Sequence, residues 1–263
     1  MKLSFQTAGP AGDLTILVHT AVPQEERETL AQRLMALPEL EASRVYFLLP
    51  PAGDGVIRLE APHGVFSGNA LAFGALSFAA ARGVRREKKL PVEMAGLEQA
   101  CTVHVNPLAG HATVDLPLPL AAEKVPFLGQ PVPVVVFPGI VHALWQEGAL
   151  PEDGTLLPAL QALAQSWDCP AAGAMGWNFR TQAMTPVLWL PGESALRHRP
   201  TCSSGAAAAA AWSALRGGQG HRKLDVRQPG GVVQTAAVGQ PGALRRLTAS
   251  FPVSLGPTYE LTF

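Results

Sequence analysis

The feature that most constrains the fold is an element that occurs twice, once in each half of the chain. In both places a turn containing serine and glycine runs directly into a long helical stretch rich in alanine. The turns read Phe66-Ser67-Gly68-Asn69 and Thr201-Cys202-Ser203-Ser204-Gly205, and Ser67 and Cys202 lie 135 residues apart in a chain of 263. We therefore expect two domains of similar design, each built around one such helix.

The segments around these helices also follow one scheme in both halves. Short runs of β-branched and apolar residues predict strands, and leucine spacing predicts a further helix in each half, at residues 24–37 and 156–165. Residues 117–133 contain five prolines, and we interpret this stretch as a linker. The predicted domains are residues 1–120 and residues 130–263, with a last strand that can return to the first domain.

Composition excludes several classes of function. Lysine and arginine number 20, as do aspartate and glutamate, so the neutral chain has no electrostatic basis for binding nucleic acid or an anionic membrane. No apolar run reaches the length of a membrane span or a signal peptide, and we expect a cytoplasmic protein. Three cysteines without a CxxC or HExxH pattern predict neither a disulfide framework nor a metal site.

The two turns suggest a specific chemistry. A helix N-terminus presents unpaired N–H groups and the positive end of the helix dipole, and it therefore attracts a carboxylate. A thiolate is stabilised in the same place and can then act as a general base. Cys202 is the cysteine in this setting. Cys101 lies in a predicted strand as a small core residue, and the neighbouring carboxylate of Asp168 disfavours a thiolate at Cys169.

These residues resemble the diaminopimelate epimerase superfamily, in which each domain carries one cysteine at a helix N-terminus. Ser67-Gly68-Asn69 is similar to its Cys-Gly-Asn motif, and Cys202-Ser203-Ser204-Gly205 is similar to its Cys-Gly-Ser/Thr-Gly motif. The opening strand around Asp13 resembles that of histidine racemases from opine-metallophore (staphylopine-type) biosynthesis. Val141-His142 and Gln228-Pro229-Gly230-Gly231 resemble two further motifs, so the resemblance extends from about Gly9 to Gly231.

The resemblance implies an α+β fold of two pseudo-symmetric domains, each a curved, mostly antiparallel sheet wrapped around a central helix. It also implies a homodimeric amino-acid racemase that needs neither pyridoxal phosphate nor a metal ion. Two groups on opposite faces of the substrate remove and return the α-proton, and Cys202 and Ser67 occupy these catalytic positions. The implied substrate-binding residues are Asp13, Gly68, Asn69, His142, Ser203, Ser204 and Gly205, with Asp13 and His142 at the amine and side-chain ends.

The sequence departs from the family pattern at residue 67, where serine replaces the first cysteine. A serine hydroxyl is a poor base at neutral pH without an activating neighbour, for which His63 is a candidate. Ser67 is an engineered replacement, or a natural one that works with Cys202 and water, or the mark of a different reaction. Asp13 replaces an asparagine, and its carboxylate either favours a cationic substrate group or caps a turn.

Two other functions remain open at this stage. One is an isomerase of the phenazine-biosynthesis type, which has the same fold and uses an acidic residue in the first domain, where this chain has Ser43. The other is a non-catalytic amino-acid-binding protein. Ahead of Cys202, Arg197 and Arg199 either bind a substrate carboxylate or belong to a surface loop.

Overall fold

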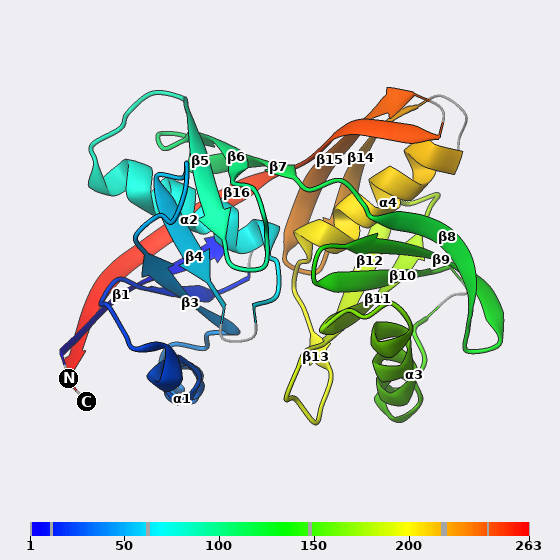
Figure 1. Cartoon of the computed structure of the whole chain (residues 1–263), viewed down its shortest axis with the longest axis horizontal. Helices are drawn as coiled ribbons and strands as arrows, with labels where there is room; N and C mark the ends of the chain where they lie inside the picture. The colour runs from blue at the N-terminus through cyan, green and yellow to red at the C-terminus, as the bar shows by residue number, and fades with distance from the viewer. Residues whose placement is uncertain are drawn as a thin grey trace. The chain divides into compact units, whose positions relative to one another are not determined.

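The computed structural model describes residues 2–10, 13–61, 64–146, 149–216, 220–240 and 242–262. Contacts divide the chain into two compact units, which we call unit 1 (Met1–Val114 with Ser250–Phe263) and unit 2 (Asp115–Ala249). In each unit a curved sheet surrounds one helix, which is α2 (Gly68–Ala81) in unit 1 and α4 (Ser203–Arg216) in unit 2 (Figure 1).

The sheet of unit 1 closes on itself. Its strand order is β1-β2-β3-β4-β5-β6-β7-β16, and β1 also pairs with β16. Two pairs are parallel: β2 with β3 across helix α1 (Gln24–Met35), and β4 with β5 across α2. The strands are β1 (Lys2–Pro10), β2 (Thr15–Val18), β3 (Arg44–Leu49), β4 (Ile57–Glu60), β5 (Lys88–Met94), β6 (Cys101–Asn106), β7 (His111–Leu116) and the later part of β16 (Ala243–Thr262).

Unit 2 has the strand order β16-β15-β14-β12-β11-β10-β9-β8, with the short β13 paired to β12. Here β10 and β11 are parallel across helix α3 (Asp153–Ser166), and β12 and β14 are parallel across α4. Each unit therefore repeats strand, helix, parallel strand, antiparallel strand, helix and parallel strand. The strands are β8 (Ala121–Phe127), β9 (Gln130–Phe137), β10 (Ile140–Trp145), β11 (Ala171–Asn178), β12 (Ala183–Trp189), β13 (Arg197–His198), β14 (His221–Gln228) and β15 (Gly231–Gln240).

The central helices are buried on all sides, which explains their small residues. Six consecutive alanines of α4, residues 206–211, have no exposed surface, and a side chain at Gly74 in α2 would overlap Leu59. Short side chains at these positions let the strands approach the helix closely. The outer helices α1 and α3 bury one face each. No helix among the described residues is long and apolar enough to cross a membrane.

The predicted linker at residues 117–133 is wrong, because residues 121–133 form β8, a tight turn and the start of β9. Leu128 and Gly129, with φ of 51° and 77°, make the tight turn between the two strands. Pro126 lies in β8, at the end of the strand order, and Pro131 and Pro133 precede the part of β9 that pairs with β10. Proline is tolerated where a strand has a neighbour on one side only. Residues 243–262 form the single long strand β16, whose later part pairs with β1.

Candidate active-site residues at two helix N-termini

Ser67 is the N-cap of α2. Its hydroxyl accepts the backbone N–H of Ala70 at 3.3 Å, and its carbonyl accepts the N–H of Leu71 at 3.2 Å. Its own N–H donates to Met94 Sδ at 3.3 Å, and the side chain is buried. Serine is among the best N-cap residues because its oxygen satisfies one of the free amides of the first turn. The amides of Gly68 and Asn69 lie before the first possible intrahelical acceptor.

A buried carboxylate lies beside this cap. Asp13 is 2% exposed, its Oδ2 atom lies 3.5 Å from Asn69 Nδ2, and its Oδ1 atom lies 2.8 Å from Ser43 Oγ. Ser43 Oγ is also 2.8 Å from the carbonyl of Leu14. The backbone carbonyl of Asp13 accepts the hydroxyl of Thr15 at 3.1 Å. The structure thus groups Asp13, Asn69 and Ser43, and it gives Ser43 a polar role beside the carboxylate.

Cys202 stands at the start of α4 as Ser67 does at the start of α2. Its sulfur accepts the N–H of Gly205 at 3.3 Å, and its carbonyl accepts the N–H of Ala206 at 3.0 Å. The thiol is buried, with 6% of the residue exposed. Both caps therefore bond to the third and fourth residues that follow them. The amides of Ser203 and Ser204, like those of Gly68 and Asn69, precede the first intrahelical acceptor.

Gln228 fixes the backbone of Cys202, a role that was not expected from the sequence. Its Oε1 atom accepts the Cys202 N–H at 2.6 Å, and its Nε2 atom donates to the Cys202 carbonyl at 3.3 Å. Two residues later, the N–H of Gly230 donates to the carbonyl of Pro200 at 2.9 Å. The β14–β15 turn thus holds the approach to α4 as a neighbouring strand would. The available signal was the position of Gln228 directly before Pro-Gly-Gly.

His142 lies beneath the first turn of α4. It has no exposed surface, and its Nε2 atom lies 2.9 Å from Ser204 Oγ, which in turn lies 3.4 Å from Cys202 Sγ. Burial lowers the pKa of His142 to about 3, so the imidazole is neutral at physiological pH. His142 was expected at the amine or side-chain end of the substrate, whereas its partner in the structure is Ser204.

The remaining predicted residues divide by their contacts. Gly205 was expected to bond a carboxylate, but its amide donates to Cys202 Sγ. A Cβ atom there would lie 2.2 Å from Met175 Sδ, so glycine lets α4 approach β11. The two arginines before Cys202 differ in exposure. Arg197 is exposed and paired with Glu193 at 2.7 Å, whereas Arg199 is buried. His63 lies outside the described residues.

The other two cysteines have different surroundings. Cys101 is buried in β6, and Cys169 is half-buried after α3. Burial, followed by the neighbouring Asp168 carboxylate, raises the pKa of the Cys169 thiol and disfavours its thiolate. This confirms the argument made for Cys169 from the sequence. Within the described ranges, no three His, Cys, Asp or Glu side chains are grouped so that they could hold a metal ion.

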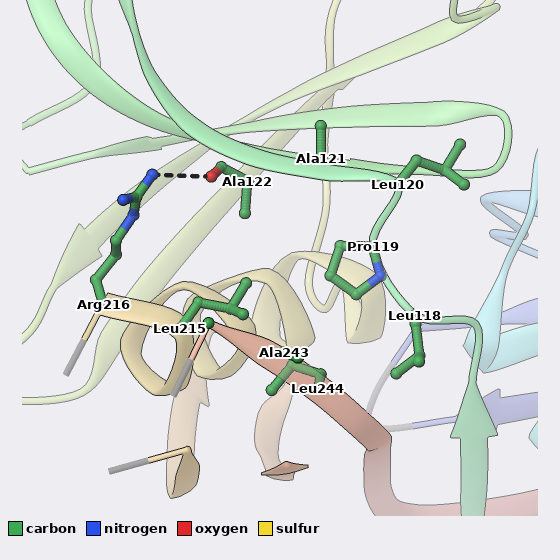
Figure 2. Close-up of a pocket in the computed structure, with 10 residues that line it drawn as sticks. Leu118, Pro119, Leu120, Ala121, Ala122, Leu215, Arg216, Ala243 and Leu244 are labelled. Atoms are coloured by element: carbon green, nitrogen blue, oxygen red, sulfur yellow. Dashed lines mark hydrogen bonds between the residues drawn. The ribbon is translucent and has the colours of Figure 1, made fainter. Parts of the chain in front are cut away.

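A pocket of about 400 Å³ in unit 2 lies at the opposite end of α4 from Cys202 (Figure 2). Aliphatic side chains line most of it, and the side chain of Arg216 donates to the carbonyl of Ala122 at 3.2 Å. An acid–base reaction needs a group that exchanges protons at neutral pH, and no described lining residue offers one. The first turns of α2 and α4 are therefore the better candidates for chemistry.

The chain resembles known proteins in sequence and in fold. The family described as "Histidine racemase CntK N-terminal domain" matches residues 2–256. No curated protein matches the chain. Among solved structures, a predicted epimerase from Pseudomonas aeruginosa is similar with a TM-score of 0.71 and 14% identity, covering 100% of both chains.

Two further structures have the same fold. A hydroxyproline epimerase from Agrobacterium vitis, with bound trans-4-hydroxy-L-proline, has a TM-score of 0.69 and 13% identity over 99% of this chain and 92% of the other. A phenazine biosynthesis protein of the PhzF family from Bacillus anthracis has a TM-score of 0.67 and 14% identity over 100% and 99%. The fold is therefore the α+β fold of the diaminopimelate epimerase-like proteins. The chain belongs to the histidine racemase family, and it is an isomerase of the racemase and epimerase type.

Proposed function

We propose that the chain is a cofactor-independent histidine racemase in which the caps of α2 and α4 act on opposite faces of one substrate α-carbon. The observation that carries this proposal is the equivalence of Ser67 and Cys202. Each is buried, each directly precedes a central helix, and each accepts the amide three residues later at 3.3 Å. The family match supports histidine as the substrate.

The first turns of the two helices supply the carboxylate site. The amide of Gly68 in α2, and the amides of Ser203 and Ser204 in α4, precede the first intrahelical acceptor. Such amides, together with the positive end of a helix dipole, bind an anion. They also stabilise the negative charge that develops when the α-proton leaves, because that charge spreads onto the carboxylate.

Proton transfer is unequal on the two faces. The Cys202 thiolate takes the α-proton, becomes a thiol, and leaves a carbanion on the substrate. The carbanion then takes a proton either back from Cys202 or, on the opposite face, from the Ser67 hydroxyl, which recovers a proton from water. A hydroxyl can protonate so strong a base, but it is a poor base itself. Return to the original face is therefore the faster outcome.

The buried Asp13 carboxylate supplies the counter-charge for a cationic part of the substrate. An amino acid at neutral pH carries an ammonium group, and histidine also carries an imidazole that gains a proton readily beside a carboxylate. Asp13 is held by Ser43 at 2.8 Å and lies near Asn69, a residue of the first turn of α2. This arrangement selects a cationic group close to the carboxylate site.

The test is to incubate the chain with L-histidine and D-histidine separately in deuterated water and to follow the α-proton by NMR and the enantiomers by chiral chromatography. Because the equilibrium constant of racemisation is one, racemisation must be equally efficient from either enantiomer. Proton exchange has no such restriction. We expect one enantiomer to exchange its α-proton with retention much faster than it racemises, and the other enantiomer to exchange slowly.

Ser67→Cys provides the matched variant, because it places a thiol at both caps. We expect it to raise racemisation by about a hundredfold, the usual contribution of a positioned acid–base group. Cys202→Ala is the control and should exchange neither enantiomer. Binding of histidine without α-proton exchange in the wild type and in Ser67→Cys would show instead a binding protein. Exchange of another amino acid in preference to histidine would overturn the substrate assignment alone.

A further inference from the structure

A line of three hydrogen-bonded side chains leads from the Cys202 sulfur into the interior of unit 2. Ser204 Oγ lies 3.4 Å from Cys202 Sγ and 2.9 Å from His142 Nε2. All three residues are buried, and His142 has no exposed surface. His142 comes from β10 and Ser204 from α4, 62 residues later, so the fold of unit 2 creates the line.

The atoms at the two ends determine which way the hydrogens point. At the inner end, His142 Nδ1 has no hydrogen-bond partner in the described part of the chain. The ring lies against Phe137, with centroids 6.2 Å apart, and against Gly173, where an added Cβ would approach Nδ1 to 2.7 Å. A neutral imidazole carries one N–H, and a buried N–H without an acceptor is rarely tolerated. The hydrogen therefore belongs on Nε2.

The remaining directions follow from that assignment. His142 Nε2–H donates to Ser204 Oγ, so the Ser204 hydroxyl hydrogen is directed to Cys202 Sγ. That sulfur already accepts the amide of Gly205 at 3.3 Å. Two donors thus converge on one sulfur, which is the arrangement that suits a thiolate.

We propose that His142 and Ser204 are positioning residues that keep a hydroxyl hydrogen directed at the Cys202 thiolate, the state that removes the α-proton. This inference rests on the role proposed above for Cys202. Ser204 cannot pass a proton to His142, because Nε2 already holds a hydrogen and Nδ1 has no partner to which it could pass one. A proton that Cys202 takes from the substrate therefore returns to the substrate or to solvent and does not enter the protein.

Among the described residues of the strands that contact α4, His142 is the one buried titratable side chain. α4 contacts β8, β9, β10, β11, β14 and β15. Strands β9, β11 and β15 carry no titratable side chain, and β10 carries only His142. Arg199 is buried on the segment that leads into Cys202. The titratable groups of β8 and β14 are exposed or half-buried: Glu123, Lys124, His221, Arg222, Lys223, Asp225 and Arg227.

The first experiment does not depend on activity. NMR of the protein with ¹⁵N-labelled histidine distinguishes the two neutral forms of the ring, and His142→Gln identifies the His142 signals by their loss. We expect the form protonated at Nε2, unchanged between about pH 5 and pH 8, the range in which an ordinary histidine changes charge. The form protonated at Nδ1, or a charge change within that range, would overturn the proposal.

The second experiment measures the rate of α-proton exchange and its KM. Ser204→Ala and His142→Leu should each lower the maximal rate about tenfold, because each removes one hydrogen bond on the path to a charged group, with little change in KM. His142→Gln should recover part of this rate, since its side-chain amide can donate from nearly the same position as Nε2. Ser204→Ala tests the line even if His142→Leu fails to fold.

The double variant Ser204→Ala with His142→Leu should be no slower than about twice the worse single variant, because both changes break one line. His198→Gln, a matched change at an exposed histidine bonded to Asp153, should keep the wild-type rate. Independent effects that multiply in the double variant would overturn the proposal. If no variant and no wild type exchanges any amino acid, the proposed function fails, and the NMR result still decides the direction of the line.

Discussion

The two units begin their central helices in the same way and surround the two caps differently. Ser67 and Cys202 have matching bonds to the residues that follow them. Three residues support Cys202. Ser204 contacts its sulfur, His142 contacts Ser204, and Gln228 bonds its backbone. Beside Ser67 stand Met94, which accepts its amide, and the Asp13 group.

This difference suggests a division of work between the units. Around Cys202, Gln228 fixes the backbone and the amide of Gly205 donates to the sulfur, an environment that suits proton transfer. Around Ser67 the hydroxyl is used as a helix cap, and the nearby charge is a buried carboxylate, which suits binding a cation. Under the proposed function, unit 2 therefore supplies the stronger base, and unit 1 supplies the counter-charge for a cationic group of the substrate.

The variant with the largest expected effect is Cys202→Ser, which gives both helices the same cap and tests whether the thiol is the base. A serine keeps the bond to the Gly205 amide, so the fold should remain, but the base is lost. We expect α-proton exchange with histidine to fall about a thousandfold, within the usual contribution of a general base. Cys169→Ser is the matched control and should exchange at the wild-type rate. Exchange that survives in Cys202→Ser would place the base elsewhere.

A double exchange of the caps tests whether they are equivalent. Combining Ser67→Cys with Cys202→Ser moves the only cap thiol to α2. If the two caps address opposite faces of one α-carbon, the enantiomer that exchanges its α-proton should be the one that the wild type exchanges slowly. We expect about a tenfold lower rate than in the wild type, because the Ser204–His142 line stays in unit 2. An unchanged enantiomer preference would contradict the proposed arrangement.

The caps could be predicted from the sequence, whereas their surroundings could not. Both central helices begin inside the turns that the sequence marks, because serine, glycine and alanine indicate a helix start and a buried helix locally. The bonds from His142 to Ser204 and from Gln228 to Cys202 join residues 62 and 26 positions apart. They depend on strand order and register, which local patterns do not contain. The prolines of β8 and β9 predicted a linker for the same reason: proline is excluded only from strands paired on both sides, and the local sequence does not show the pairing.

Acid should weaken unit 2 through His142. Its pKa is held near 3 by burial, below the value of 6.5 for an exposed histidine, so the folded state favours the neutral ring. The stabilisation is complete above pH 6.5 and is lost as the pH falls toward 3, because the unfolded chain takes up the proton first. Between pH 6.5 and about pH 5 we expect a loss of about 2 kcal/mol.

Tryptophan fluorescence during urea unfolding measures this loss, because all five tryptophans belong to unit 2: Trp145, Trp167, Trp177, Trp189 and Trp212. His142→Gln serves as the reference, since glutamine places an amide near the position of Nε2 and its side chain does not titrate. The decrease in unfolding free energy between the two pH values should be larger in the wild type by the expected amount. Burial also lowers the pKa of His19 in unit 1, but both proteins share that contribution. Equal decreases in the two proteins would show that folding does not lower the pKa of His142.

The smallest effect is expected from Ser67→Ala, and it separates the two roles of this residue. As an N-cap, Ser67 should contribute about 1 kcal/mol to stability, which urea unfolding followed by circular dichroism can measure. As the proton donor on the second face, it should affect racemisation but not the exchange that Cys202 performs on the first face. We therefore expect α-proton exchange of the preferred enantiomer within about twofold of the wild type, together with a further loss of the slow racemisation. Unchanged racemisation would show that Ser67 is only a helix cap and that water protonates the second face. A parallel loss of exchange on both faces would mean that the cap positions the substrate itself.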